Sequence, residues 1–343
     1  MLDNAARRQR ACAVIALVTA CGSMVLRLTW ALGGRWGYTA CSTREVSRAE
    51  AASGCGADAV ADLPLVHGWV AVALSAVAAL VAVAALKRAR WAGPAALAAC
   101  AVVLAVSFPL HLLFEVPAGL AGWPTDWRGV VHRLVLVAGA LAFAGAVPRA
   151  RCPHPADRPV RPLPPWARRA AYAGLVLPLV GWTLPHLLWM LGVPAGITRH
   201  TLDEALRLGL PIQLLITFAP AAGAVLTVGL TRPWAQRVPR RVPGLGGRRM
   251  PRMLAIGPAM TVAFALAGYG LWGLALMTRD VATGAVTVRS LITSWAVVGT
   301  EIVFVGWAAA VAVATAGYAR ATRCGPCRSA RVPAVDVRAG ARA

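Results

Sequence analysis

Long apolar runs alternate with short polar segments along the whole chain. Eight of these runs reach or approach the length of about 20 residues that an α-helix needs to cross the hydrocarbon core of a bilayer. They cover residues 11–33, 65–86, 95–114, 130–148, 169–192, 208–230, 253–277 and 291–318. The pattern therefore predicts an all-α fold, an eight-helix transmembrane bundle.

Internal repetition divides the chain into two halves. The sequences Trp-Xaa-Leu-Gly and Gly-Pro-Ala each occur once per half, at 30–33, 189–192, 93–95 and 257–259. A polar side chain stands three residues before each of these tryptophans, Arg27 in the first half and His186 in the second. We interpret this as a tandem duplication of a four-helix unit, at 11–148 and 169–318. Because four is an even number, the two copies run in the same direction, as a parallel repeat.

Composition and charge favour a membrane protein. Only 14% of the residues are charged and 58% are hydrophobic, whereas soluble domains carry about 25% charged residues. The net charge of +22 does not indicate a nucleic-acid partner, because the basic residues fall in short segments between apolar runs. With the first ten residues in the cytoplasm, alternation places 25 Lys and Arg inside and 8 outside. The positive-inside rule then predicts a multi-pass plasma-membrane protein with both termini cytoplasmic.

The predicted cytoplasmic segments are basic, and two of them, the 149–168 linker and the 233–251 connector, are rich in proline. The segments are the N-terminus (1–10), a linker (149–168), the connector from 233 to 251 and a tail (319–343). Proline cannot occupy a helix interior without removing a hydrogen bond and clashing with the preceding turn. We therefore expect solvated, partly disordered linkers that contact anionic lipid headgroups.

Five cysteines and one histidine outside the apolar runs are candidates for a disulfide or a metal site. Cys41 and Cys55 share the first outer segment, where an oxidising exterior favours a disulfide; two free thiols are the alternative. Cys324 and Cys327 form a Cys-Gly-Pro-Cys sequence, but it lies in a basic tail without the βα context of a redox motif. Together with Cys152 and His154 this pair could supply zinc ligands. A solvated tail is the simpler interpretation.

Ionisable side chains at membrane depth or at outer helix ends form the candidate binding residues: Arg27, His67, His111, His132, Arg133, His186 and Glu301. Such groups are costly in a bilayer and usually face the bundle interior, which makes them functional candidates. A His or Arg near a helix end can instead extend to the interface. Glu301 stands ten residues into the last run and is too deep for that. We expect it to pair with Arg27 or Arg133, or to carry a proton.

The architecture resembles that of haem A synthase. That family also has two tandem four-helix halves, a cysteine pair in the first outer loop and histidines on its even-numbered helices. His67 on the second run and His132 on the fourth match this placement, and residues 127–133 are similar to its acidic-Trp-His-Arg segment. The sixth and eighth runs contain no histidine, so the resemblance supplies only one of two haem-ligand pairs. In composition the chain is similar to polytopic membrane proteins of high-GC actinomycetes.

Three functions remain open from the sequence. The first is transport or binding of a small solute in an outward-facing polar pocket between the halves, with Glu301 and the outer histidines in proton coupling. The second is a membrane enzyme or electron carrier with histidines as haem or metal ligands. The third is a non-catalytic partner of another membrane protein. No Walker loop, dinucleotide fingerprint or nucleophile elbow occurs in a suitable context, so ATP hydrolysis of the soluble type is not expected.

Overall fold

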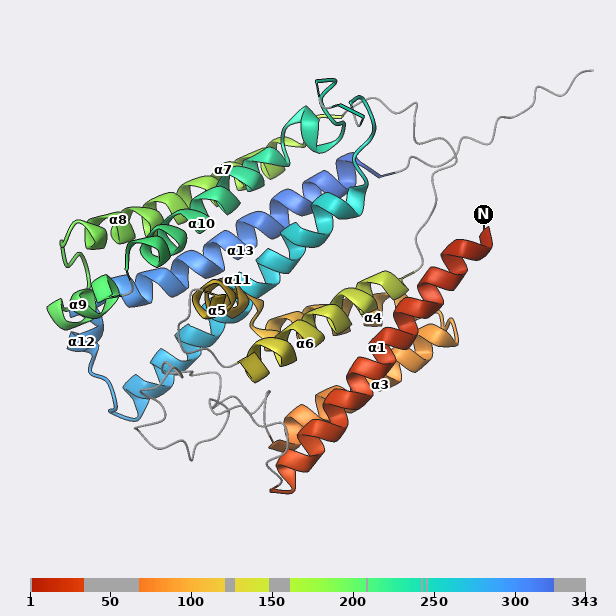
Figure 1. The fold of residues 1–343 in the computed structure, drawn as a ribbon, viewed down its shortest axis with the longest axis horizontal. Coiled ribbons are helices and arrows are strands. Elements are labelled where there is room, and N and C mark those ends of the chain that lie inside the picture. The colour runs from red at the N-terminus through yellow and green to blue at the C-terminus, as the bar shows by residue number, and fades with distance from the viewer. Residues whose placement is uncertain are drawn as a thin grey trace, which may run out of the picture.

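Helices form most of the residues that the computed structural model describes, which are 2–33, 68–120, 127–147, 161–207, 209–241, 243–244 and 246–323 (Figure 1). The helices of the first half are α1 (Leu2–Ala31), α3 (Gly68–Leu86), α4 (Ala92–Ser107), α5 (Pro109–Leu120) and α6 (Trp127–Ala146). Those of the second half are α7 (Pro165–Pro178), η3 (Leu179–Thr183), α8 (Leu184–Met190), α9 (Arg199–Arg207), α10 (Leu210–Gly229), η4 (Pro233–Ala235), α11 (Arg252–Ala282), α12 (Val288–Thr293) and α13 (Trp295–Ala321). The predicted all-α class is confirmed.

Seven helices in the described residues are long and apolar enough to cross a membrane. These are Ala6–Ala31, Gly68–Leu86, Trp127–Ala146, Pro165–Met190, Leu210–Gly229, Arg252–Ala282 and Trp295–Ala321. They identify a multi-pass membrane protein. α1 extends back to Leu2, so the N-terminal segment 1–10, expected to precede the first helix, is largely helical.

The third predicted crossing, 95–114, is not one helix. α4 ends at Ser107, and Phe108 has a left-handed backbone conformation with a φ of 44° before α5 begins at Pro109. The break is local in origin, because Pro109 has no N–H to donate and disfavours helical backbone at the residue before it. α5 is seen end-on in Figure 1, whereas α4 and α6 lie across the page, so the chain turns sharply here.

The fifth predicted crossing is continuous but contains a π-helical turn. η3 joins α7 to α8 between Pro178 and Pro185. Each proline lacks an N–H, and the wider turn between them accommodates the displaced carbonyls. Trp182 and Thr183 of η3 donate side-chain hydrogen bonds to carbonyl oxygens of α10, Ile216 at 2.8 Å and Thr217 at 3.2 Å. The irregular turn is therefore fixed to a neighbouring helix.

Each half has its own core of small residues. In the first half α1 packs against α3 and α6, and α4 packs against α6; the buried cluster there consists mostly of alanine. In the second half α13 packs against α11 and α7, and α7 packs against α10. α11 joins the halves by contacting α4 and α5. Small residues permit these close approaches, which replace the hydrophobic effect as the source of helix association in lipid.

The two ends of the bundle differ in charge. The start of α1, the α3–α4 turn, the 231–251 connector and the end of α13 lie toward one end, and α9 and α12 toward the other (Figure 1). The first group carries exposed Lys87, Arg88, Arg240 and Arg241, and we call this the basic end. α9 was not predicted; its buried Leu202 packs with Ile197 and Ala296 against Trp189 at the opposite end.

The connector after α10 is folded rather than loose. The Val238 N–H donates to the carbonyl oxygen of Arg248, and the Gly247 N–H donates to the carbonyl oxygen of Val238, so the connector reverses direction between them. The buried Tyr318 hydroxyl of α13 donates to the carbonyl oxygen of Ala235 at 2.6 Å. Gln236 forms two hydrogen bonds with the backbone of Arg161. The described part of this connector is therefore solvated but folded, unlike the partly disordered linker that was expected, because hydrogen bonds within it and to Arg161 and Tyr318 fix its course.

Candidate functional site

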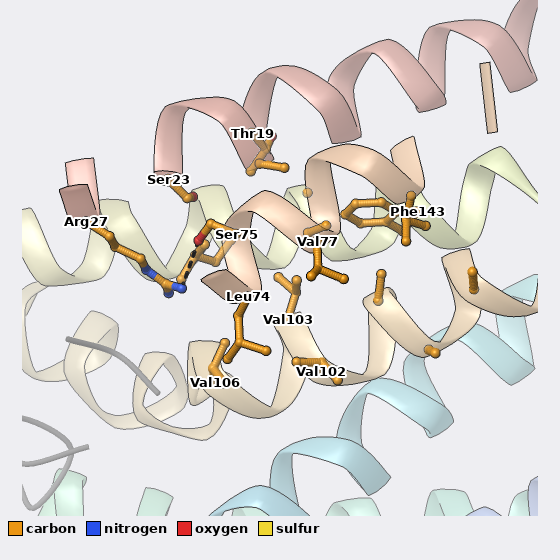
Figure 2. Close-up of a pocket in the computed structure, with 18 residues that line it drawn as sticks. Thr19, Ser23, Arg27, Leu74, Ser75, Val77, Val102, Val103, Val106 and Phe143 are labelled. Carbon is orange, nitrogen blue, oxygen red and sulfur yellow. Dashed lines mark hydrogen bonds between the residues drawn. The ribbon is translucent and has the colours of Figure 1, made fainter. Parts of the chain in front are cut away.

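A cavity of about 290 Å³ lies inside the first half, between α1, α3, α4 and α6 (Figure 2). Its walls are Ala, Val, Leu, Phe and Gly apart from four polar side chains, those of Thr19, Ser23, Arg27 and Ser75. The volume is near the lower limit of about 300 Å³ for ligand pockets. A polar pocket between the halves was expected; this cavity instead lies within one half, and its lining is apolar apart from those four side chains.

Arg27 lies at the end of the cavity that is farther from the basic end of the bundle. Its side chain is only 3% exposed. Nη1 donates to the Ser75 hydroxyl oxygen at 3.1 Å and to the Ala71 carbonyl oxygen at 3.3 Å, both on α3. Nε and Nη2 are buried and have no hydrogen-bond partner in the described part of the chain. These two nitrogens form one edge of the guanidinium, the edge that binds a carboxylate or phosphate in a bidentate manner.

His186 belongs to a row of aromatic rings and lies outside this cavity. Its ring stacks on Trp182 with centroids 4.2 Å apart and contacts Trp189 at 4.3 Å. Trp182 in turn stacks on Phe304 of α13 at 5.1 Å. The row continues through Tyr269 of α11 at 5.6 Å and to Phe108, at the α4–α5 break, at 6.5 Å. The rings thus connect the second half to the first, and the His186 Nδ1 atom lies 2.8 Å from the Trp182 carbonyl oxygen.

Glu301 does not reach the first half. Its carboxyl group lies over Gly273 of α11, in the space that a Cβ atom there would occupy. The side chain is 8% exposed, and Oε2 is buried without a hydrogen-bond partner in the described residues. The predicted pairing with Arg27 is wrong, because Arg27 bonds to α3 in the other half. Since α13 begins at Trp295, Glu301 is six residues into its helix rather than ten.

The remaining candidates are only partly placed. His132 of α6 contacts Trp30 edge-on, with ring centroids 5.9 Å apart, and Arg133 follows it on the same helix. His67, Cys41, Cys55, Cys152, His154, Cys324 and Cys327 lie outside the described residues, as does the side chain of His111. In the parts of the chain that are described, no three His, Cys, Asp or Glu side chains are arranged to hold a metal ion.

Sequence reasoning missed most of the cavity. Ser75, Ala98 and Val102 line it, yet each is of a type that also occurs at other positions in the apolar runs. The one available signal was the high content of alanine between 71 and 101, since runs of small side chains leave space that larger neighbours do not always fill.

Comparison of the chain with protein-family models, with curated proteins and with solved structures found no match. The functional conclusions therefore depend on the geometry of the site.

Proposed function

We propose that this chain is a multi-pass plasma-membrane protein that binds or transports a small anionic solute. The solute would occupy the cavity in the first half, which has Arg27 at one end. The observation that supports the proposal is a guanidinium that is almost fully buried and whose Nε–Nη2 edge has no hydrogen-bond partner among the described residues. A buried cation without a counter-ion is costly in a bilayer, and such residues mark substrate and ion pathways. An anion from outside the chain would supply the two hydrogen bonds that the described residues leave unmade.

Arg27→Gln tests this role. The melting temperature of the purified full chain would be measured against a series of sodium carboxylates, phosphates and sulfonates, because a ligand that binds only the folded state stabilises it. Removing a charge-assisted bidentate pair is expected to weaken anion binding about tenfold or more. Arg199→Gln, an exposed arginine between α8 and α10, is the matched control. Anion-induced stabilisation that is equal in both variants and the parent chain would refute the proposal.

We also propose eight crossings, with α4 as a shortened third. α4 has 16 residues, a length of about 24 Å, against a hydrocarbon core of about 30 Å. It is antiparallel to its neighbour α3 because only the short 87–91 turn joins them. Local thinning of the bilayer or tilting would accommodate the difference. An even number of crossings is also what brings both termini to the same side.

The tandem repeat remains part of the proposal and has support from helix pairing. In the first half the first helix pairs with the second and the fourth, and the third pairs with the fourth, as α1–α3, α1–α6 and α4–α6. The second half repeats this order as α7–α10, α7–α13 and α11–α13. Arg27 and His186 then occupy corresponding places one turn before Trp30 and Trp189.

Topology gives a separate prediction. Single cysteines introduced at His200 or Thr283 should react with a membrane-impermeant maleimide in intact cells, because both positions are exposed at the end opposite the basic end. Cysteines at Arg88 or Arg240 should react only after permeabilisation, since the positive-inside rule places the basic end in the cytoplasm. The eight native cysteines are first replaced. Labelling of Arg88→Cys in sealed cells would reverse the orientation.

A further inference from the structure

The cavity is elongated along the helix axes. Its lining residues on α4 extend from Ala95 to Val106, which corresponds to about 16 Å at 1.5 Å per residue. That is about half of the hydrocarbon thickness of ~30 Å, the depth that the chains of one leaflet occupy. All six α4 residues that line the cavity are Ala or Val. A ligand therefore finds no hydrogen-bond partner along this wall.

The cavity borders the lipid side of the bundle between α3 and α4. Val77 of α3 and Val102 of α4 both line it, and they are 57% and 44% exposed. Ala98, one turn from Val102 on α4, also lines the cavity and is exposed. In a membrane-spanning helix, exposed apolar side chains face acyl chains rather than water. A ligand can therefore enter from the bilayer without crossing a polar surface.

The only charged side chain among the lining residues lies at one end, whereas the uncharged Ser23 and Thr19 follow one and two turns away along α1. Arg27 and Ser75 lie at the end of the cavity away from the basic end, and Figure 2 shows their hydrogen bond there, with mostly apolar side chains along the remainder. Arg27 is four residues before the end of α1 at Ala31, about 6 Å along the axis. A headgroup bound at Arg27 would thus lie near the surface of the membrane, and its chain would point toward the middle.

From this arrangement we infer that the ligand is an anionic amphiphile with a single alkyl chain, of the fatty-acid or lysolipid kind, that enters between α3 and α4. The inference rests on the proposed function, because it uses the same Nε–Nη2 edge of Arg27 for the carboxylate or phosphate. The apolar walls hold the alkyl chain and select for its length. A compact, fully hydrated anion has no apolar atoms to pack against these walls.

The experiment compares chain length and charge on the purified full chain in a neutral detergent. Sodium dodecanoate, sodium hexanoate and dodecyltrimethylammonium chloride are titrated while the melting temperature is recorded. Burial of each methylene favours binding about fourfold from water, and the micelle competes for part of this gain. We expect dodecanoate to raise the melting temperature at concentrations at least tenfold lower than those at which hexanoate does so. Dodecyltrimethylammonium should not stabilise the protein.

Two variants on one helix separate the cavity from the general lipid surface. Ala98→Phe places a ring at the opening between α3 and α4. This variant should need at least tenfold more dodecanoate than the parent chain for the same rise in melting temperature. Leu97→Phe is the matched control, because Leu97 is exposed on α4 but does not line the cavity. It should respond to dodecanoate as the parent chain does. If Ala98→Phe does not fold, the comparison of hexanoate with dodecanoate on the unmutated protein tests the inference by itself.

The outcomes distinguish this inference from the proposed function. If hexanoate and dodecanoate stabilise the protein at equal concentrations, and this effect still depends on Arg27, the inference of an amphiphilic ligand is overturned. The proposed site for a small anion is then retained. Stabilisation by dodecyltrimethylammonium equal to that by dodecanoate would show that charge has no part in recognition, and would overturn it too. An Arg27→Gln variant that responds to both carboxylates like the parent chain would overturn the proposed function itself.

Discussion

Gly270→Leu is expected to prevent the chain from accumulating as a folded membrane protein. A Cβ atom at Gly270 would lie 2.7 Å from the Glu301 carbonyl oxygen and 3.1 Å from the Phe304 Cβ atom. The first contact is with backbone, so α11 and α13 must separate along their whole interface. Overpacking commonly costs about 1–3 kcal/mol and occasionally more. Since a leucine adds three further carbons beyond the Cβ atom, we expect a loss of at least about 3 kcal/mol.

Abundance in the membrane fraction and the size-exclusion profile in detergent measure this effect. Gly270→Ala should give an intermediate result, a folded protein with a lower melting temperature. Gly257 is the matched control on the same helix, because a Cβ atom there meets nothing within 4 Å. Gly257→Leu should leave both readouts unchanged. Equal losses at the two positions would mean that α11 does not pack closely on α13 at Gly270.

The course of the long helices was predictable because the bilayer imposes a simple rule. A crossing segment must satisfy its backbone hydrogen bonds internally and expose apolar side chains, so length and apolarity suffice to locate it. The rule located α1, α3, α6, α10 and α13 to within a few residues in most cases. It failed at Phe108, where the overall apolarity of 95–114 concealed a break that Pro109 already indicated.

The partners of the buried charges were not predictable in the same way. Arg27 was recognised as a candidate because an arginine inside an apolar run is costly wherever it points. Its actual neighbour, Ser75, is an ordinary serine 48 residues away, and only the packing of α1 on α3 brings the two together. The assumption that opposite charges at similar depth would meet placed Glu301 beside Arg27. That assumption ignored the division into halves, which puts α13 against α11 and α7.

Glu301 is the polar group whose burial is hardest to explain by structure alone. Its carboxyl group fills the space beside Gly273, and Oε2 has no hydrogen-bond partner among the described residues. An unsatisfied buried polar group costs about 1–3 kcal/mol, and more when it is charged. A leucine would have nearly the same volume without that cost. We therefore expect Glu301 to reduce stability, which is the pattern expected of a residue with the proposed role in proton coupling.

Glu301→Leu should accordingly raise the free energy of unfolding by about 1–3 kcal/mol, observed as a higher melting temperature of the purified chain. In proteoliposomes, Glu301→Gln should abolish any dependence of anion uptake on a pH gradient and leave binding at Arg27 unchanged. Thr315→Val is the control on the same helix, since it removes another buried oxygen without a described partner but no carboxyl group. It should not alter the pH dependence. A lower melting temperature for Glu301→Leu would assign the residue a structural role, in which its carboxyl group stabilises the contact between α11 and α13.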